Sequence, residues 1–448
     1  MRIAGILVVY GMFAIQGFAS DSARPNVVLV HSHDYGQYLH CYGVQTVQTP
    51  HLDQFAAEGV RFARSFCTNP GCSSSRASLF TGRYPHNNGV MGLTHANFGW
   101  DLKPDEKHLA QYLKEAGYET VAIGVIHETH SGAQRCGYMK YLKQASAAPG
   151  TTAAIQELQR LAGQKRPFFL YAGFTDTHRP WGSSQPDSSL GVEVPGFLRD
   201  TPGTREELAA FQGAVRHLDL QVGRLMDAIH DLGLEANTLV IVTTDHGIPF
   251  PRAKCCVHDP GLQVALLLRY ASRKGWHGGV VRNEMVSNID VLPTILELAG
   301  IPVPAKVQGR SFAPLLDGRP YVPNAEIFGE LTYHDSYDPE RSIRTETHKL
   351  IANFSTAPAF MDPSQQWRPK SDPAEARPSF HPYLELYDLT TDPWELHNLA
   401  RDPKYAQVRE ELSRRLYQHL VETDDPLLRG AVTSPQHERT LKMLQGQS

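Results

Sequence analysis

The sequence predicts an α/β protein with a mainly parallel central sheet flanked by helices, followed by a smaller C-terminal α+β domain. Over most of the chain, short apolar runs alternate with longer amphipathic stretches, which is typical of successive βα units. After about Pro323 this pattern gives way to short strand-like pieces between loops rich in Pro and Asp. A chain of 448 residues is also long enough for one large and one small domain.

The expected elements follow this alternation along the chain. Each strand is a short apolar run, and each helix is an amphipathic stretch that in several cases ends at glycine. In the large domain we expect strands at 26–30, 120–123, 168–172, 239–243 and 264–268, and helices at 51–59, 106–116, 151–162, 205–232 and 289–299. In the small domain we expect strands at 349–354 and 384–387, a Pro-rich loop at 355–378 and a final helix at 406–423.

The N-terminal segment has the features of a secretory signal. Arg2 precedes a largely apolar run that ends at the small-residue cleavage site Gly17-Phe18-Ala19. The run is shorter than the ~20 residues of a membrane span. We therefore expect a cleaved signal at 1–19, the large domain at 24–323, the small domain at 324–448, and a periplasmic or secreted protein without a membrane anchor.

Composition narrows the class of protein further. The net charge of -4 and the pI near 6.6 show no overall excess of basic residues, so we expect no nucleic-acid partner. Export permits disulfides, but their connectivity cannot be read from the sequence. The six cysteines are Cys41, Cys67, Cys72, Cys136, Cys255 and Cys256.

The stretch from Cys72 to Arg83 predicts a short helix with an anion site at its start. Ser73 to Ser75 are favourable N-cap residues and Gly82 is a natural stop. Such a helix places free N–H groups and its positive end beside Cys72. Arg76 adds a planar, permanently charged guanidinium suited to oxyanions. The alternative is that Cys72 is a buried structural thiol.

Polar residues also follow four of the expected strands, at the point where each strand ends. They are His33-Asp34, His127, Asp176 with His178, and Asp245-His246-Gly247. A single such residue is commonly a loop or capping residue. Since ligands of open parallel sheets bind at the carboxyl ends of the strands, the four clusters together predict one shared crevice.

Several of these segments resemble the sulfatase family. Residues 72–83 are similar to the family signature, residues 26–36 to its first strand and Asp-Asp-x-Gly metal loop, and residues 243–247 to its second metal loop. With a C-terminal similarity at 385–400, the resemblance spans roughly 25–402.

Four shorter stretches are similar to one subgroup of this family, the sulfamidases or N-sulfoglucosamine sulfohydrolases. They are Phe168–Tyr171, Asp176–Arg179, Asp245–Pro251 and Glu385–Asp388. The resemblance implies an alkaline phosphatase-like fold and an enzyme that hydrolyses sulfate esters or sulfamates of a sulfated saccharide, with N-sulfoglucosamine as the first substrate to consider.

The resemblance also implies the catalytic residues. Cys72 is oxidised to formylglycine by a formylglycine-generating or anaerobic maturation enzyme, and its hydrated aldehyde attacks sulfur and touches the metal. Arg76 holds the formylglycine oxygens, Lys254 and His178 contact the sulfate group, and His127 helps to expel sulfate. These residue types suit the reaction, because cations neutralise charge that builds toward the leaving group and histidine moves protons near neutral pH.

One divalent cation is implied, with Cys72, Asp34, Asp245, His246 and His33 as ligands. The family favours Ca²⁺, which prefers oxygen ligands. The expected ion is therefore Ca²⁺, with Mn²⁺ or Zn²⁺ as the alternatives because imidazoles suit them better. A further alternative is that His33 turns away and leaves Asp34 as the sole ligand of its loop.

Two positions depart from the family pattern. Ser74 stands where the family usually has Pro or Ala, a position that helps the maturation enzyme to recognise its target. Val125 stands where the family usually has Lys, two residues before His127. A positive contact is therefore missing there, unless Arg179 supplies it.

Other roles stay open at this point. Lys254 has an ordinary solvated lysine as its alternative, and the segment 333–335 with Arg341 lines either a glycan subsite or a plain loop. The alternative functions are a phosphodiesterase or phosphonate monoester hydrolase of the same superfamily, and a non-catalytic binder of sulfated glycan.

Overall fold

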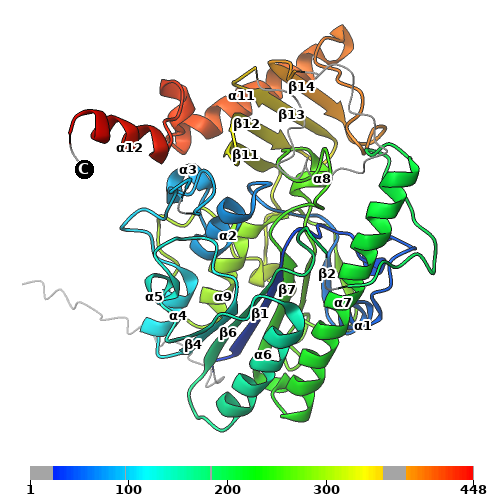
Figure 1. Ribbon diagram of the computed structural model, residues 1–448, viewed down its shortest axis with the longest axis vertical. Helices are drawn as coiled ribbons and strands as arrows, with labels where there is room; N and C mark the ends of the chain where they lie inside the picture. The colour runs from blue at the N-terminus through cyan, green and yellow to red at the C-terminus, as the bar shows by residue number, and fades with distance from the viewer. Residues whose placement is uncertain (1–23, 96, 182–183, 357–379, 447–448) are drawn as a thin grey trace, which may run out of the picture.

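The chain forms two sheets with helices around them (Figure 1). The structure, a computed structural model, describes residues 24–95, 97–181, 184–356 and 380–446. The expected signal at 1–19 and most of the expected loop at 355–378 lie outside the described residues. None of the described helices is both long and apolar enough to cross a membrane.

The larger sheet has eight strands in the order β5-β4-β6-β1-β7-β8-β2-β9. Their bounds are β1 Asn26–Ser32, β2 Val60–Phe62, β4 Glu119–Gly124, β5 Lys140–Leu142, β6 Phe168–Phe174, β7 Thr238–Thr244, β8 Leu266–Arg269 and β9 Val280–Arg282. The central strands β4, β6, β1 and β7 are mutually parallel, and β8 runs antiparallel to β7 and β2. The prediction of a mainly parallel sheet is confirmed.

Helices cover both faces of this sheet, so its central strands are apolar on both sides. Along β1, Val28 and Val30 pack with one layer of helices and Val27 and Leu29 with the other. The first layer is α1 (Pro50–Glu58), α6 (Ala147–Ala162) and α7 (Pro202–Asp231). The second is α2 (Cys72–Thr81), α4 (Leu109–Glu115), α9 (Val291–Leu298) and α10 (Ala313–Leu316).

The second sheet is antiparallel and lies beyond the carboxyl ends of the central strands (Figure 1). It contains β11 (Ile327–Tyr333), β12 (Tyr337–Arg344), β13 (His348–Asn353) and β14 (Leu384–Asp388). The hairpin of β11 and β12 was not expected from the sequence. Helix α11 (Ala406–Glu422) packs on this sheet through Leu412, Leu416 and Leu420, which lie on one face because they are four residues apart.

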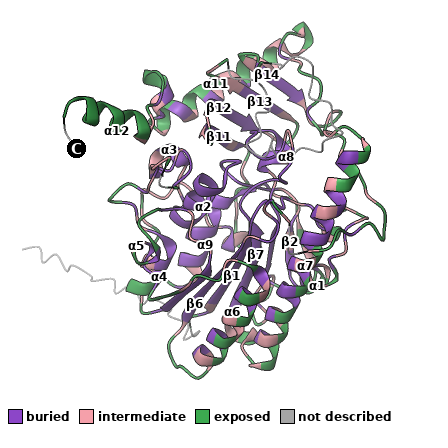
Figure 2. Ribbon diagram, viewed as in Figure 1, coloured by how far each residue is buried: buried purple, intermediate pink, exposed green. Residues whose placement is uncertain are grey.

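Short elements complete the fold. They are β3 (Ser65–Phe66), β10 (Val286–Ser287), α3 (Pro85–Asn88), α5 (Ala133–Cys136), α8 (Asp259–Leu262) and α12 (Pro435–Leu444). The expectation that the helix at 406–423 is the last one was wrong, because α12 follows it. Helix α12 has no buried residue, and its amphipathic pattern faces solvent (Figure 2).

The packing of α11 on the second sheet makes a pH-dependent stability prediction. The ring of His419 stacks on Phe328 with centroids 3.6 Å apart, and burial lowers the pKa of His419 to about 3. An unfolded histidine has a pKa near 6.5. The stabilisation that the neutral, buried His419 ring gives to the folded state is therefore complete above that pH and is lost as the pH falls toward 3. Between pH 7 and 5 we expect His419 to cost up to about 2 kcal/mol of unfolding free energy.

Urea unfolding at the two pH values measures this difference. His419→Leu should remove most of it, whereas His437→Leu, which replaces an exposed histidine on α12, should leave it in place. A His419→Leu protein with the same pH dependence as the unmodified chain would contradict the prediction.

Candidate active site

The four polar clusters predicted from the sequence all follow neighbouring parallel strands. His33 and Asp34 follow β1, His127 follows β4, His178 follows β6, and Asp245 with His246 follows β7. Because these strands are adjacent in the sheet, their carboxyl ends form one edge, and helix α2 begins above it (Figure 1).

Helix α2 begins at Cys72 and ends before Gly82, whose φ of 67° provides a left-handed cap. The expectation that a serine caps this helix was wrong. The N-cap residue is Gly71, whose N–H donates to Asn69 Oδ1 at 2.7 Å. The serines lie inside the first turn instead, where Ser75 donates to the carbonyl of Asp245 at 2.5 Å and so ties the helix to the loop after β7.

The thiol of Cys72 is buried at the start of this helix, and the imidazoles of His127, His246 and His334 are its closest titratable neighbours. Burial opposes ionisation, but His127 and the contacts with His246 and His334 outweigh it and hold the pKa of Cys72 well below its usual range. All six cysteines lie in the described part of the chain, and none forms a disulfide.

A buried group of carboxylates and imidazoles lies next to Cys72. Asp34 Oδ1 is 3.2 Å from His246 Nε2, and Asp245 Oδ2 is 2.9 Å from His33 Nδ1. His33 does not turn away from the group. The backbone N–H of Asp34 donates to Asp245 Oδ1 at 2.9 Å, which holds the two loops together.

This group fits a metal ion. The Nδ1 of His246 lies 3.0 Å from the carbonyl of Gly247, so its proton belongs there and the Nε2 lone pair faces the Asp34 carboxylate. Asp34 Oδ1, His246 Nε2 and His33 Nδ1 are buried and form no hydrogen bond to the described residues. A cation between these atoms would satisfy them, and ligand atoms of His33, Asp34 and Asp245 lie within 4.8 Å of one another, close enough to share one ion.

Lys254 stands on the other side of Asp34. Its ammonium donates to Asp34 Oδ2 at 2.7 Å and lies 3.1 Å from His178 Nε2. The Nδ1 of His178 is 2.5 Å from the carbonyl of Arg179, which leaves Nε2 as the acceptor toward Lys254. Burial works against both charges, yet Asp34 raises the pKa of Lys254, and Lys254 is the first of the neighbours that lower the pKa of Asp34. The alternative of an ordinary solvated lysine is therefore wrong.

Arg76 lies fully buried between the helix and the sheet. Its Nε donates to Asp245 Oδ2 at 3.2 Å, and its Nη1 donates to the Tyr171 hydroxyl at 2.6 Å. Its Nη2 is buried and has no partner among the described residues, so one donor remains for an oxyanion.

Two histidines of the site were missed by sequence reasoning as site residues. His95 Nε2 lies 2.9 Å from His127 Nε2, and His334 projects from the turn between β11 and β12 to reach Cys72. His334 Nδ1 pairs with Asp335 at 3.2 Å, which orients its ring. For the segment 333–335, the sequence leaves a glycan subsite and a plain loop as alternatives. No motif marked either histidine.

Three other residues lie away from Cys72. Asp176 accepts from the backbone N–H of Ala147 at 2.5 Å and so holds the first turn of α6. Arg179 forms an ion pair with Glu207, so the suggestion that it replaces the amine missing at position 125 finds no support in its described contacts. Arg341, considered for a glycan subsite, is buried and paired with Asp425 at 2.6 Å.

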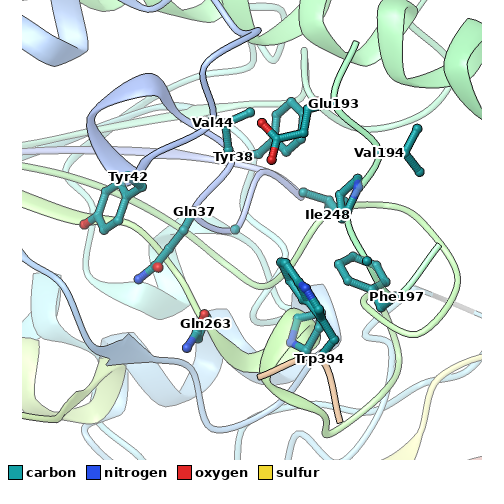
Figure 3. A pocket seen from close by; sticks show the side chains of 14 residues that line it. Gln37, Tyr38, Tyr42, Val44, Glu193, Val194, Phe197, Ile248, Gln263 and Trp394 are labelled. Carbon is teal, nitrogen blue, oxygen red and sulfur yellow. The ribbon is translucent and has the colours of Figure 1, made fainter. Parts of the chain in front are cut away.

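A cavity of about 450 Å³ lies close to the proposed metal ligands along the chain. Its lining includes Gly36, two residues after Asp34, and Ile248, two residues after His246. The close-up shows the rings of Trp394 and Phe197 at its rim, opposite Gln37 (Figure 3). None of the predicted catalytic residues lines it, so the cavity and the Cys72 site are separate features.

Comparison with known protein families gives two matches. The profile of the Sulfatase family matches residues 25–301, and the profile described as "N-sulphoglucosamine sulphohydrolase, C-terminal" matches residues 252–382.

Individual relatives cover nearly the whole chain. Human N-sulphoglucosamine sulphohydrolase is 31% identical, over 90% of this chain and 91% of that protein. An ulvan-active sulfatase of Formosa agariphila is 27% identical, over 92% of this chain and 83% of that protein. Among solved structures, a protein in complex with its substrate D-glucosamine-2-N,6-O-disulfate superposes with a TM-score of 0.69 at 20% identity, covering 90% of this chain and 98% of that one. A 2-O glycosaminoglycan sulfatase gives 0.70 at 21% identity, covering 92% and 94%.

Proposed function

Because this chain belongs to the sulfatase family, we propose that it hydrolyses a sulfate ester or sulfamate of a sulfated glycan, with N-sulfoglucosamine as the preferred residue. One observation carries this proposal. Cys72 lies buried at the positive end of α2, in contact with His127 and His246, with Arg76 and Lys254 nearby.

Cys72 is the proposed nucleophile in its modified form. Conversion to formylglycine by a maturation enzyme would supply a hydrated aldehyde, and the sulfur of Cys72 stands where those oxygens would be. The unpartnered Nη2 of Arg76 suits the role of holding one such oxygen. Ser74 is buried in the first turn of the helix, so a maturation enzyme must recognise this segment before the chain folds.

The sulfate group itself would be held by positive groups. Lys254 and the first N–H groups of α2 can neutralise its oxygens. His178 has one face exposed to solvent, with 40% of its side chain accessible, so it suits contact with the saccharide side of the sulfate.

His127 is proposed to move the proton when the sulfate is expelled. Its backbone N–H donates to the Glu128 carboxylate at 2.8 Å, and Glu128 is itself held by His108 at 3.2 Å. This chain of contacts holds the backbone of His127, whose ring lies near Cys72. His95 contacts this ring, with the two Nε2 atoms 2.9 Å apart.

The proposed metal ligands are His33, Asp34, Asp245 and His246, joined by residue 72 in its modified form. A divalent cation there would neutralise charge on the sulfate oxygens. Two imidazole nitrogens favour Mn²⁺ or Zn²⁺, while the family favours Ca²⁺. The ligand atoms of this chain lead us to propose a transition metal.

The substrate proposal is tested with purified full-length protein and a panel of defined sulfated monosaccharides. We expect sulfate release from N-sulfated glucosamine at a kcat/KM at least about 10-fold above that for O-sulfated sugars, because discrimination of this size needs only about 1.4 kcal/mol of differential binding. Ion chromatography of released sulfate measures it. Sulfate release from O-sulfated sugars alone would overturn the proposed substrate but would still support sulfate-ester hydrolysis as the reaction.

A phosphodiesterase or phosphonate monoester hydrolase is the second candidate. The observation that favours it is the pair of imidazoles at the metal group, because such sites suit transition metals. Aryl sulfate and aryl phosphodiester assayed side by side separate the two functions, and faster cleavage of the phosphodiester would select this candidate.

We further propose that residues 1–19 direct export, so that the protein acts in the periplasm or outside the cell. The proposed domains are 24–323 and 324–448. His334 comes from the second and Cys72 from the first, so both domains would be needed for one complete site.

A further inference from the structure

A second buried group of carboxylates and imidazoles lies between the small sheet and the large domain. Asp338 and Glu340 lie on β12, Glu385 on β14, His381 shortly before β14, and His258 shortly before α8. All five are buried. Strand β13 lies between β12 and β14, and helix α8 lies at the same end of the molecule, where Asp259 of α8 pairs with Arg344 of β12 at 3.1 Å (Figure 1).

Three atoms of this group have the spacing of metal ligands. His381 Nε2 lies 3.4 Å from Asp338 Oδ2 and 3.3 Å from Glu340 Oε1. Ligands about 2.0–2.1 Å from a tetrahedral ion are separated by about 3.3–3.4 Å. Glu340 Oε1 is buried, points toward these atoms and accepts no hydrogen bond from the described residues.

The imidazole of His381 is also oriented as a ligand. Its Nδ1 lies 3.6 Å from Glu385 Oε1, which directs Nε2 toward Asp338 and Glu340. Glu385 is held in turn by Asn353 Nδ2 at 2.8 Å and by the Tyr387 hydroxyl at 2.5 Å. A carboxylate behind a histidine is the usual support of a metal-binding imidazole.

The charge of the group calls for a cation. No described Lys or Arg lies within ion-pair distance of Asp338, Glu340 or Glu385, whose described ion-pair partners are His381 and His258. Without a metal, protons must compensate three buried carboxylates.

We propose that Asp338, Glu340 and His381 bind a divalent transition-metal ion, with Zn²⁺ as the fitting probe, at a site separate from the Cys72 site. The metal would join β12 to the chain just before β14. Glu340 Oε2 accepts from the backbone N–H of Val257 at 3.5 Å, so the site also fixes the loop that carries Lys254. The proposal does not depend on the proposed function.

Metal content tests it. Full-length protein is stripped with a chelator, reloaded with Zn²⁺, dialysed and analysed by plasma mass spectrometry. Glu340→Gln should hold one Zn²⁺ fewer per chain than the unmodified protein. Glu410→Gln, an exposed carboxylate on α11, should hold the same number. Asp34→Asn removes a ligand of the proposed metal site near Cys72. A loss of metal in that variant concerns that site alone and does not affect the comparison of Glu340→Gln with Glu410→Gln.

A second measurement covers the case in which a variant folds poorly. Zn²⁺ should raise the unfolding temperature of Asp34→Asn, which keeps the second site, and should not raise that of Asp34→Asn combined with His381→Gln. Glutamine has the shape of a protonated glutamic acid. If protons alone satisfy the group, Glu340→Gln will keep both the metal content and the unfolding temperature of the unmodified chain, and the proposal is overturned.

Discussion

Cys72→Ala should lower kcat/KM for sulfate release by about 10⁴-fold or more, the scale seen when a nucleophile is removed. The thiol lies between His127, His246 and His334, and alanine leaves these groups without the atom that they surround. Mass spectrometry of the peptide containing residue 72 accompanies the assay, because formylglycine is lighter than cysteine. We expect the lighter form in protein made with a maturation enzyme.

Cys67→Ala is the matched control. Cys67 is also a buried free thiol near the start of α2, and its Sγ donates to the carbonyl of Asn69 at 3.2 Å, away from the histidines. This variant should keep its activity. Equal activity of Cys72→Ala and the unmodified chain would sink the nucleophile assignment. An unmodified, inactive protein that still binds sulfated glycan would favour the non-catalytic binder.

Asp245→Asn should have the second-largest effect, on activity and on stability together. Asp245 faces Arg76, His33 and His246 and accepts from the backbone of Asp34. Removing its charge leaves the guanidinium of Arg76 buried beside a neutral amide, which should cost about 3–5 kcal/mol of unfolding free energy. Loss of a metal ligand should also lower kcat/KM by about 10³-fold or more.

Urea unfolding, metal content and initial rates measure the three effects. Asp227→Asn, an exposed aspartate on α7, makes the same chemical change outside the site and should alter none of them. If Asp245→Asn retained its metal and its activity, the loop after β7 would not be part of a metal site.

The large domain was predictable because its strands carry continuous apolar runs. The strands near 26, 120, 168 and 239 are buried on both faces, and such runs read clearly from sequence. The β11–β12 hairpin was not readable, because β12 contains Asp338, Glu340 and Arg341 at buried positions. The burial of Arg341, for example, is compensated by Asp425, which lies in a distant segment of the chain. A local pattern does not contain that information.

The residues of the candidate site also fall into two classes, those that the sequence could group in advance and those whose position depends on tertiary packing. His33, Asp34, Asp245 and His246 could be grouped in advance, since each follows a strand of one parallel sheet. The capping role given to the serines failed because Gly71 already adopts the extended N-cap conformation and Asn69 fixes it. His95 reaches His127, and His334 reaches the neighbourhood of Cys72, from loops whose paths depend on tertiary packing, and sequence spacing does not determine such paths.

The contribution of His334 has a consequence for protein engineering. His334 comes from the turn between β11 and β12 of the second sheet, so the large domain expressed alone would lack this neighbour of Cys72. Chimeras that exchange the C-terminal domain between relatives would therefore alter the immediate surroundings of residue 72.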